Sequence, residues 1–292
     1  MSRLSKALAL AASIRLGEVL VLQGAPLIGI AFSIGPITAP KLVTSLIFAG
    51  ASFLLVAHIF TLNDWADFAR GVHHSNGAMS QLESRNITPP LLLLFSLLLL
   101  LASLSLFLLL SACCSLLAAG IAALGIFYSH PSLNLKSIPI VSSLLHFVGG
   151  LLHFLLGYAL FSAINEHGLV IASFFALTFT AGHLNQEVRD FDVDQQTSAR
   201  TNAVAFGKRI NFITGLILFT ISYVYLFFIA WSGVMPRLLA ILPVVLCPIH
   251  FALSVRTLND GLTSNSIRRF QTQYRVIYSL IGLAMLAALL CR

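Results

Sequence analysis

The sequence predicts an all-α protein, a polytopic membrane bundle of nine transmembrane helices with a cytosolic cap. Of the 292 residues, 58% are hydrophobic and only 9% are charged, a balance unlike that of a soluble domain. Apolar stretches also recur near the length of about 20 residues that a helix needs to cross a bilayer. We place these spans at about residues 16–34, 42–62, 90–110, 112–128, 138–163, 168–185, 210–232, 237–254 and 274–291.

The first span is expected to remain in the protein as a membrane helix. It contains Glu18, Gln23 and Pro26, so it is too long and too polar for a cleaved signal peptide. The other eight spans follow from their apolar composition, which is most uniform over residues 91–110. We expect a single domain over residues 1–292.

The loops on one side of the predicted bundle are longer and more polar than those on the other. The long set comprises residues 63–89, 129–137, 186–209 and 255–273. The short links lie near residues 35–41, 111, 164–167 and 233–236. Long loops in a compact protein usually carry function, so the long set predicts the cap.

The distribution of the +7 net charge indicates membrane topology and argues against nucleic-acid binding. With the N-terminus in the cytosol, the inner side holds fourteen cations: Arg3, Lys6, Arg15, Arg70, Arg85, Lys136, Arg189, Arg200, Lys208, Arg209, Arg256, Arg268, Arg269 and Arg275. The outer side holds Lys41, Arg237 and Arg292. The positive-inside rule therefore predicts a multi-pass protein with its N-terminus and long loops in the cytoplasm, and a bacterial inner membrane is the expected location.

Six of the ten carboxylates fall in two short clusters, at residues 63–67 and 187–194, and each adjoins a long apolar stretch. Carboxylates next to hydrocarbon are costly unless they bind something. On a helix, Asp64 and Asp67 share one face, as do Glu187, Asp190 and Asp194. Both clusters are expected on the cytoplasmic side, so the pattern predicts one shared cation site.

The cations on the same side as the clusters define the expected ligand. A patch of carboxylates alone would repel an anion, whereas carboxylates with arginines and lysines fit a polyphosphate that Mg²⁺ bridges to the acids. The alternative is that the acids are solvated and pair with neighbouring arginines. Two clusters on one membrane face favour the shared site.

Three groups of motifs in this order resemble the signature of the UbiA superfamily of intramembrane prenyltransferases. They are Asn63-Asp64-x-x-Asp67 with Arg85-Asn86, Tyr128-Ser129 with Lys136, and Glu187-x-x-Asp190-x-x-x-Asp194 with Arg200-Thr201. The resemblance covers roughly residues 15 to 290. It implies that the nine helices surround a central cavity. It also implies transfer of an isoprenyl group from an isoprenyl diphosphate to a lipophilic acceptor, such as an aromatic or quinone precursor, with two Mg²⁺ ions as the cofactor.

The resemblance also implies roles for individual residues. The catalytic acids would be Asp64, Asp67, Asp190 and Asp194. The metal ligands would be these four with Asn63 and Glu187. The diphosphate contacts would be Asn63, Arg70, Arg85, Tyr128, Ser129, Lys136, Arg200 and Lys208. Two departures bear on the metal geometry: Gly71 stands where a third acid is usual, and Glu187 stands where aspartate is more usual.

Two other functions compete with prenyl transfer. An intramembrane terpene cyclase would use the same metal site but fold one prenyl chain on itself. A transporter without catalysis would need more charge at mid-membrane depth than Glu18 provides, so it is disfavoured. Among the histidines, His146, His153 and His183 could bind the acceptor, although interhelical hydrogen bonding is the favoured interpretation.

Overall fold

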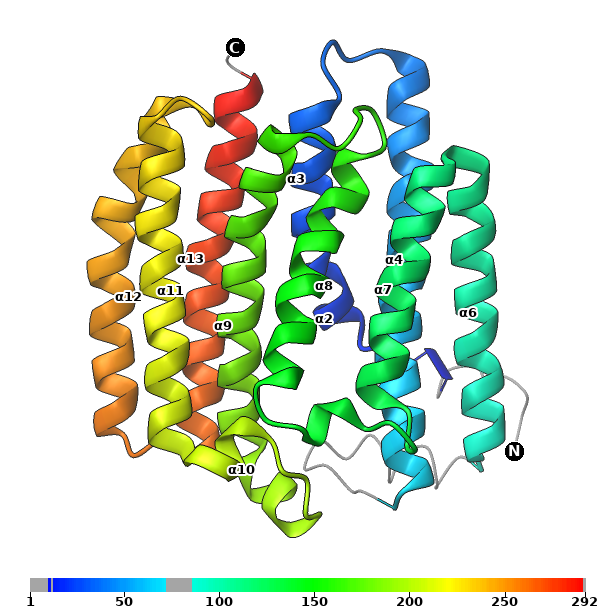
Figure 1. The fold of residues 1–292 in the computed structure, drawn as a ribbon, viewed down its shortest axis with the longest axis vertical. Helices are drawn as coiled ribbons and strands as arrows, with labels where there is room; N and C mark the ends of the chain where they lie inside the picture. The colour runs from blue at the N-terminus through cyan, green and yellow to red at the C-terminus, as the bar shows by residue number, and fades with distance from the viewer. Residues whose placement is uncertain (1–9, 12, 72–85, 291–292) are drawn as a thin grey trace.

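The computed structural model describes residues 10–11, 13–71 and 86–290, and in these ranges the chain is helical with no β-strand (Figure 1). Nine helical segments of the described chain are long and apolar enough to cross a membrane, which confirms the predicted all-α membrane bundle. The long helices are α4 (Ala39–Ala69), α6 (Pro89–Leu110), α7 (Ala112–Ser129), α8 (Val141–Tyr158), α9 (Glu166–Gln196), α11 (Lys208–Trp231), α12 (Ile241–Asn259) and α13 (Ser264–Leu290).

The first span consists of two helices, α2 (Leu16–Leu22) and α3 (Gly24–Ser33), which meet at Gln23. Short helical segments complete the fold: the 3₁₀ turns η1 (Leu135–Ser137) and η2 (Arg237–Ala240), and the helix α10 (Asn202–Phe206).

Helices α4 and α9 are longer than their predicted spans, and the extra length carries both acidic clusters. Each helix has 31 residues, so each is about 46 Å long at 1.5 Å per residue, well beyond the ~30 Å of a hydrocarbon core. The prediction that residues 63–89 and 186–209 are loops was therefore wrong for their first parts. Between Gly50 and Gly71 the sequence has no glycine or proline, so the helix continues through its polar end.

Both acidic helix ends lie at the same end of the bundle. Figure 1 shows α4 and α9 running in the same direction, with α10 and the loop before α8 at the end where they finish. The predicted outer cations Lys41 and Arg237 belong to segments at the opposite end. The described chain thus gathers its charged motifs at one pole of an apolar bundle.

Helix α8 lies at the centre of the bundle and approaches its neighbours closely at glycines. A Cβ atom built on Gly157 would lie 2.6 Å from the carbonyl carbon of Pro26 in α3. A Cβ on Gly150 would lie 2.8 Å from the Cβ of Phe179 in α9. Two hydrophobic clusters of the core share α8: one contains Phe154 and the other contains Leu156. Small residues let helices pack backbone to backbone in a membrane, where van der Waals contact drives association.

Replacing Gly157 with alanine should therefore destabilise the protein, because the new methyl group meets the backbone of Pro26, which cannot rotate away. We expect a loss of about 1–3 kcal/mol, measured by detergent-induced unfolding. Gly50→Ala in α4 is the matched control, because a Cβ there meets no atom within 4 Å. The control should be neutral or slightly stabilising. Equal behaviour of the two variants would contradict the close approach of α3 and α8.

Candidate functional site

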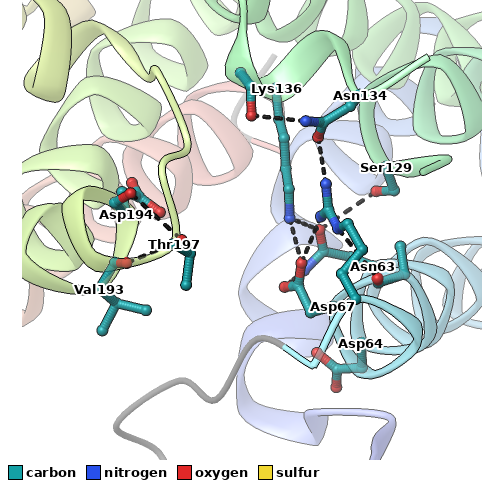
Figure 2. A network of polar contacts seen from close by, with 12 residues as sticks. Asn63, Asp64, Asp67, Ser129, Asn134, Lys136, Val193, Asp194 and Thr197 are labelled. Carbon is teal, nitrogen blue, oxygen red and sulfur yellow. Dashed lines mark hydrogen bonds and ion pairs between the residues drawn. The ribbon is translucent and has the colours of Figure 1, made fainter. Parts of the chain in front are cut away.

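The first acidic cluster lies in the last two turns of α4, and Asp67 is its buried centre. The side chain of Asp67 is only 1% exposed and accepts from Arg70 Nη2 at 2.8 Å and from Lys136 Nζ at 2.5 Å (Figure 2). Arg70 also donates to Asn134 Oδ1 at 2.6 Å. The loop that carries Lys136 is thereby attached to the end of α4.

Asn63 extends this network toward α7. Its Oδ1 lies 3.4 Å from Ser129 Oγ and 3.5 Å from Lys136 Nζ, and its Nδ2 lies 3.4 Å from Asp67 Oδ2. The structure thus brings together Asn63, Asp67, Ser129 and Lys136, four residues that the sequence places in two separate motifs (Figure 2).

Asp64 points to a different partner, Arg15, which the sequence analysis counted only for topology. Both the Nε and Nη2 atoms of Arg15 bind the Asp64 carboxylate, and the guanidinium lies 5.7 Å from the ring centre of Phe60. Arg15 has a left-handed backbone at φ 55° where α2 begins. The sequence did carry one signal for this partner: Arg15 stands directly before the first apolar span, on the same predicted side of the membrane as the acids.

The second acidic cluster lies in the last turns of α9. Arg189 binds both oxygens of Asp190, at 2.9 and 2.7 Å. Asp194 accepts from Thr201 Oγ1 at 3.3 Å. Of the predicted diphosphate contacts in this region, Lys208 pairs with Asp192 at 2.9 Å and Arg200 is exposed.

Tyr128 and Lys136 are both within electrostatic range of acids from the two clusters. Lys136 interacts electrostatically with Asp67 of α4 and with Asp194 of α9. The phenol of Tyr128 is within electrostatic range of the same two carboxylates and of Asp190. Burial lowers the pKa of Lys136 below the usual lysine range, while Asp67 opposes that shift and Arg70 adds to it. The two acidic helix ends therefore act on one set of side chains.

Glu187 occupies a different environment from the other acids of its motif. It is buried, and its carboxylate accepts from Ser142 Oγ at 3.2 Å, Asn202 Nδ2 at 3.0 Å and Asn211 Nδ2 at 3.3 Å. His183 Nε2 lies 3.1 Å from the same carboxylate. These contacts surround Glu187 with protein donors from α8, α9, α10 and α11.

The histidines contact one another across α8 and α9. The rings of His146 and His183 stack with centroids 3.6 Å apart, and the ring of Tyr128 meets His146 edge-on at 5.0 Å. His146 Nδ1 bonds to Ser142 O within α8, so stacking rather than hydrogen bonding joins the two helices at this pair. His153 is buried in α8. Arg85, a predicted diphosphate contact, lies outside the described residues.

The donor set fits Mg²⁺ bound together with a substrate. Within the described residues, no three His, Cys, Asp or Glu side chains come close enough to hold a metal by themselves. Mg²⁺ prefers oxygen ligands and is usually bound by one or two carboxylates with substrate phosphates and waters. The carboxylates of α4 and α9 supply such oxygens on two sides, and the cations beside them supply partners for phosphate.

Two lysine–aspartate pairs at this end of the bundle differ in burial, and their stability effects should differ accordingly. Lys136 and Asp67 are 14% and 1% exposed, whereas Lys208 and Asp192 are 27% and 66% exposed. We expect Lys136→Met to cost about 2 kcal/mol, less than the loss of an isolated buried pair because Arg70 still contacts Asp67. Lys208→Met should change stability by less than ~0.5 kcal/mol. Unfolding in detergent mixtures measures both, and similar losses would contradict the buried position of Lys136.

Comparison with known proteins shows the family to which the chain belongs. It matches the model of the UbiA prenyltransferase family over residues 24–288. A UbiA homologue from Archaeoglobus fulgidus bound to GPP and Mg²⁺ has a TM-score of 0.76 at 17% identity, over 96% of this chain and 99% of that chain. The same homologue bound to DMAPP and Mg²⁺ gives 0.76 and 17%, over 94% and 97%.

A structure that concerns digeranylgeranylglyceryl phosphate synthase has a TM-score of 0.73 at 15% identity, over 98% of this chain and 99% of that one. A search of curated proteins finds no match. At these identities the solved structures show a shared fold. The family match spans most of the sequence, and the chain therefore belongs to the UbiA prenyltransferase family.

Proposed function

We propose that the protein transfers an isoprenyl group from an isoprenyl diphosphate to a lipophilic acceptor, in a reaction that depends on Mg²⁺. The observation that carries this proposal is the position of Lys136 at one pole of an apolar bundle: its amine contacts Asp67 of α4, and Asp194 of α9 is near enough to act on it electrostatically. An anionic headgroup of the substrate fits the polar end, and its hydrocarbon tail fits the apolar helices.

The proposed Mg²⁺ ligands are Asn63, Asp64, Asp67, Asp190 and Asp194. Two Mg²⁺ ions, once bound, would supply positive charge to the diphosphate oxygens. Arg15, Arg70 and Arg189 contact three of these carboxylates, so their guanidinium groups lie where they would also meet the oxygens of a bound diphosphate.

The protein's own residues account for the remaining chemistry. The allylic carbon–oxygen bond breaks to give diphosphate and an allylic cation, and Lys136 and Arg70 stabilise the leaving anion. Tyr128 and Ser129, at the end of α7, border the same polar network and orient the diphosphate. The apolar helices exclude water, so the acceptor and not water attacks the cation. The acceptor's proton then passes to a carboxylate such as Asp190.

The relatives support the donor class. The Archaeoglobus fulgidus homologue was solved with GPP and with DMAPP, both together with Mg²⁺. For the acceptor we propose an aromatic or quinone-precursor compound, which would partition from the bilayer as the prenyl chain does. The excess of cations at the acidic end further supports a cytoplasmic site, with the cytoplasmic face of a bacterial inner membrane as the proposed location.

The function is tested by incubating purified protein with geranyl or farnesyl diphosphate and Mg²⁺, with and without 4-hydroxybenzoate or a dihydroxynaphthoate as acceptor. We expect prenylated product and diphosphate release only when acceptor and Mg²⁺ are both present. Asp67→Asn and Asp190→Asn should each reduce kcat/KM by about 10²–10³, because each removes charge that holds the metal.

Asp260→Asn is the matched control, since Asp260 is an exposed acid that follows α12 outside both clusters, and its activity should equal that of the wild type. A cyclic hydrocarbon formed without any acceptor would instead identify a terpene cyclase. Wild-type activity in both motif variants would contradict the site.

A further inference from the structure

Glu187 and Asn202 form a buried junction beside the second acidic cluster. Asn202 is 4% exposed and Glu187 5%, and both lie among the polar residues of the interior. Asn202 Nδ2 donates to Glu187 Oε1 at 3.0 Å, to Ser142 Oγ at 3.0 Å and to Ser143 Oγ at 3.2 Å. A carboxylate in this setting is stabilised by the donors around it, and loss of one donor leaves it undersatisfied.

Asn202 also holds the chain just before α8. Its Oδ1 accepts from the backbone N–H of Ile140 at 2.6 Å. Ile140 has φ 67° and ψ −46°, in a region that a β-branched residue rarely adopts. Such a conformation persists only where the surroundings fix it, and the hydrogen bond to Asn202 is one contact that does so.

The loop of residues 130–140 is therefore attached at two points. Asn134 binds Arg70 at the end of α4, and Ile140 binds Asn202, which is anchored on Glu187 of α9. Lys136 lies between these attachments, and its amine reaches Asp67. Since Glu187 precedes Asp190 by less than one helical turn, the junction ties the lysine-bearing loop to the second acidic cluster.

We propose that Asn202 is a positioning residue for the reaction, with Glu187 as its anchor, and that the pair sets the distance between Lys136 and the carboxylates Asp190 and Asp194. This inference rests on the proposed function for its catalytic meaning. It gives Glu187 a role other than metal ligation, because the oxygens of Glu187 already accept from Ser142, Asn202 and Asn211. Misplacement of a charged group by a small distance is enough to weaken a diphosphate site.

The first test concerns the free protein and needs no substrate. In Asn202→Leu, hydrogen exchange of backbone amides in residues 133–142 should rise at least tenfold, because the partner of the Ile140 amide is lost. Asn165→Ala is the matched control. Asn165 caps the opposite end of α9 through Gly168 N at 2.9 Å, so its loss should leave that loop unchanged. Unchanged exchange in Asn202→Leu would overturn the junction.

The second test exchanges the amide and the carboxylate, so that the double variant keeps the total charge of the pair. Binding of geranyl thiodiphosphate in the presence of Mg²⁺ is measured for Asn202→Asp, for Glu187→Gln and for the double variant. Each single variant should bind about tenfold more weakly, because Asn202→Asp places two carboxylates together and Glu187→Gln replaces one accepting oxygen with an NH2 group that faces donors. The double variant restores one donor facing one acceptor, so its affinity should return to within about threefold of wild type.

The outcomes separate the two proposals. A double variant as weak as Glu187→Gln would show that the carboxylate at 187 is itself required, as for a metal ligand, and would overturn the positioning role. Wild-type affinity in both single variants would overturn it as well. If wild-type protein fails to bind the thiodiphosphate, the proposed function fails, and hydrogen exchange still decides whether Asn202 holds the loop.

Discussion

The contact of Lys136 with Asp67 is the interaction on which the site depends. Asp67 lies in the last turn of a helix that begins at the opposite pole, and Lys136 belongs to the loop before α8. A buried carboxylate requires compensating charge, so Asp67 draws both Lys136 and Arg70 to itself. In doing so it assembles a cationic group beside carboxylates, which is the combination that a metal-bridged diphosphate needs.

The long helices connect this polar end to the apolar body. Because α4 and α9 extend well beyond a hydrocarbon thickness, each carries its acids past the apolar region without a break in the helix. Central α8 contacts α3 through Gly157 and α9 through Gly150. This close packing fixes the position of α9, which carries the second acidic cluster. The proposed chemistry uses both parts, since the headgroup needs charge and the carbocation needs protection from water.

Much of this could be predicted from sequence because it depends on local composition. Long apolar runs specify spanning helices, and the spacing of Asp64 and Asp67 specifies a shared helical region. The acids were expected on a helix, but the full length of α4 was missed, because hydropathy marks the edge of the membrane and not the end of a helix. The pairings of Arg15 and Asn202 were not predicted, because Arg15 is 49 residues from Asp64 and Asn202 is 62 residues from Ile140 in the sequence. The position of Glu187 in a donor network likewise depends on four helices meeting in space.

The most direct measurement of the central claim is a structure of the protein with geranyl thiodiphosphate and Mg²⁺ bound. The account predicts that the diphosphate lies between the two acidic helix ends, that metal links it to Asp67 and to Asp190 or Asp194, and that Lys136 contacts a phosphate oxygen. A diphosphate bound elsewhere, or held by one acidic helix end without the other, would contradict it.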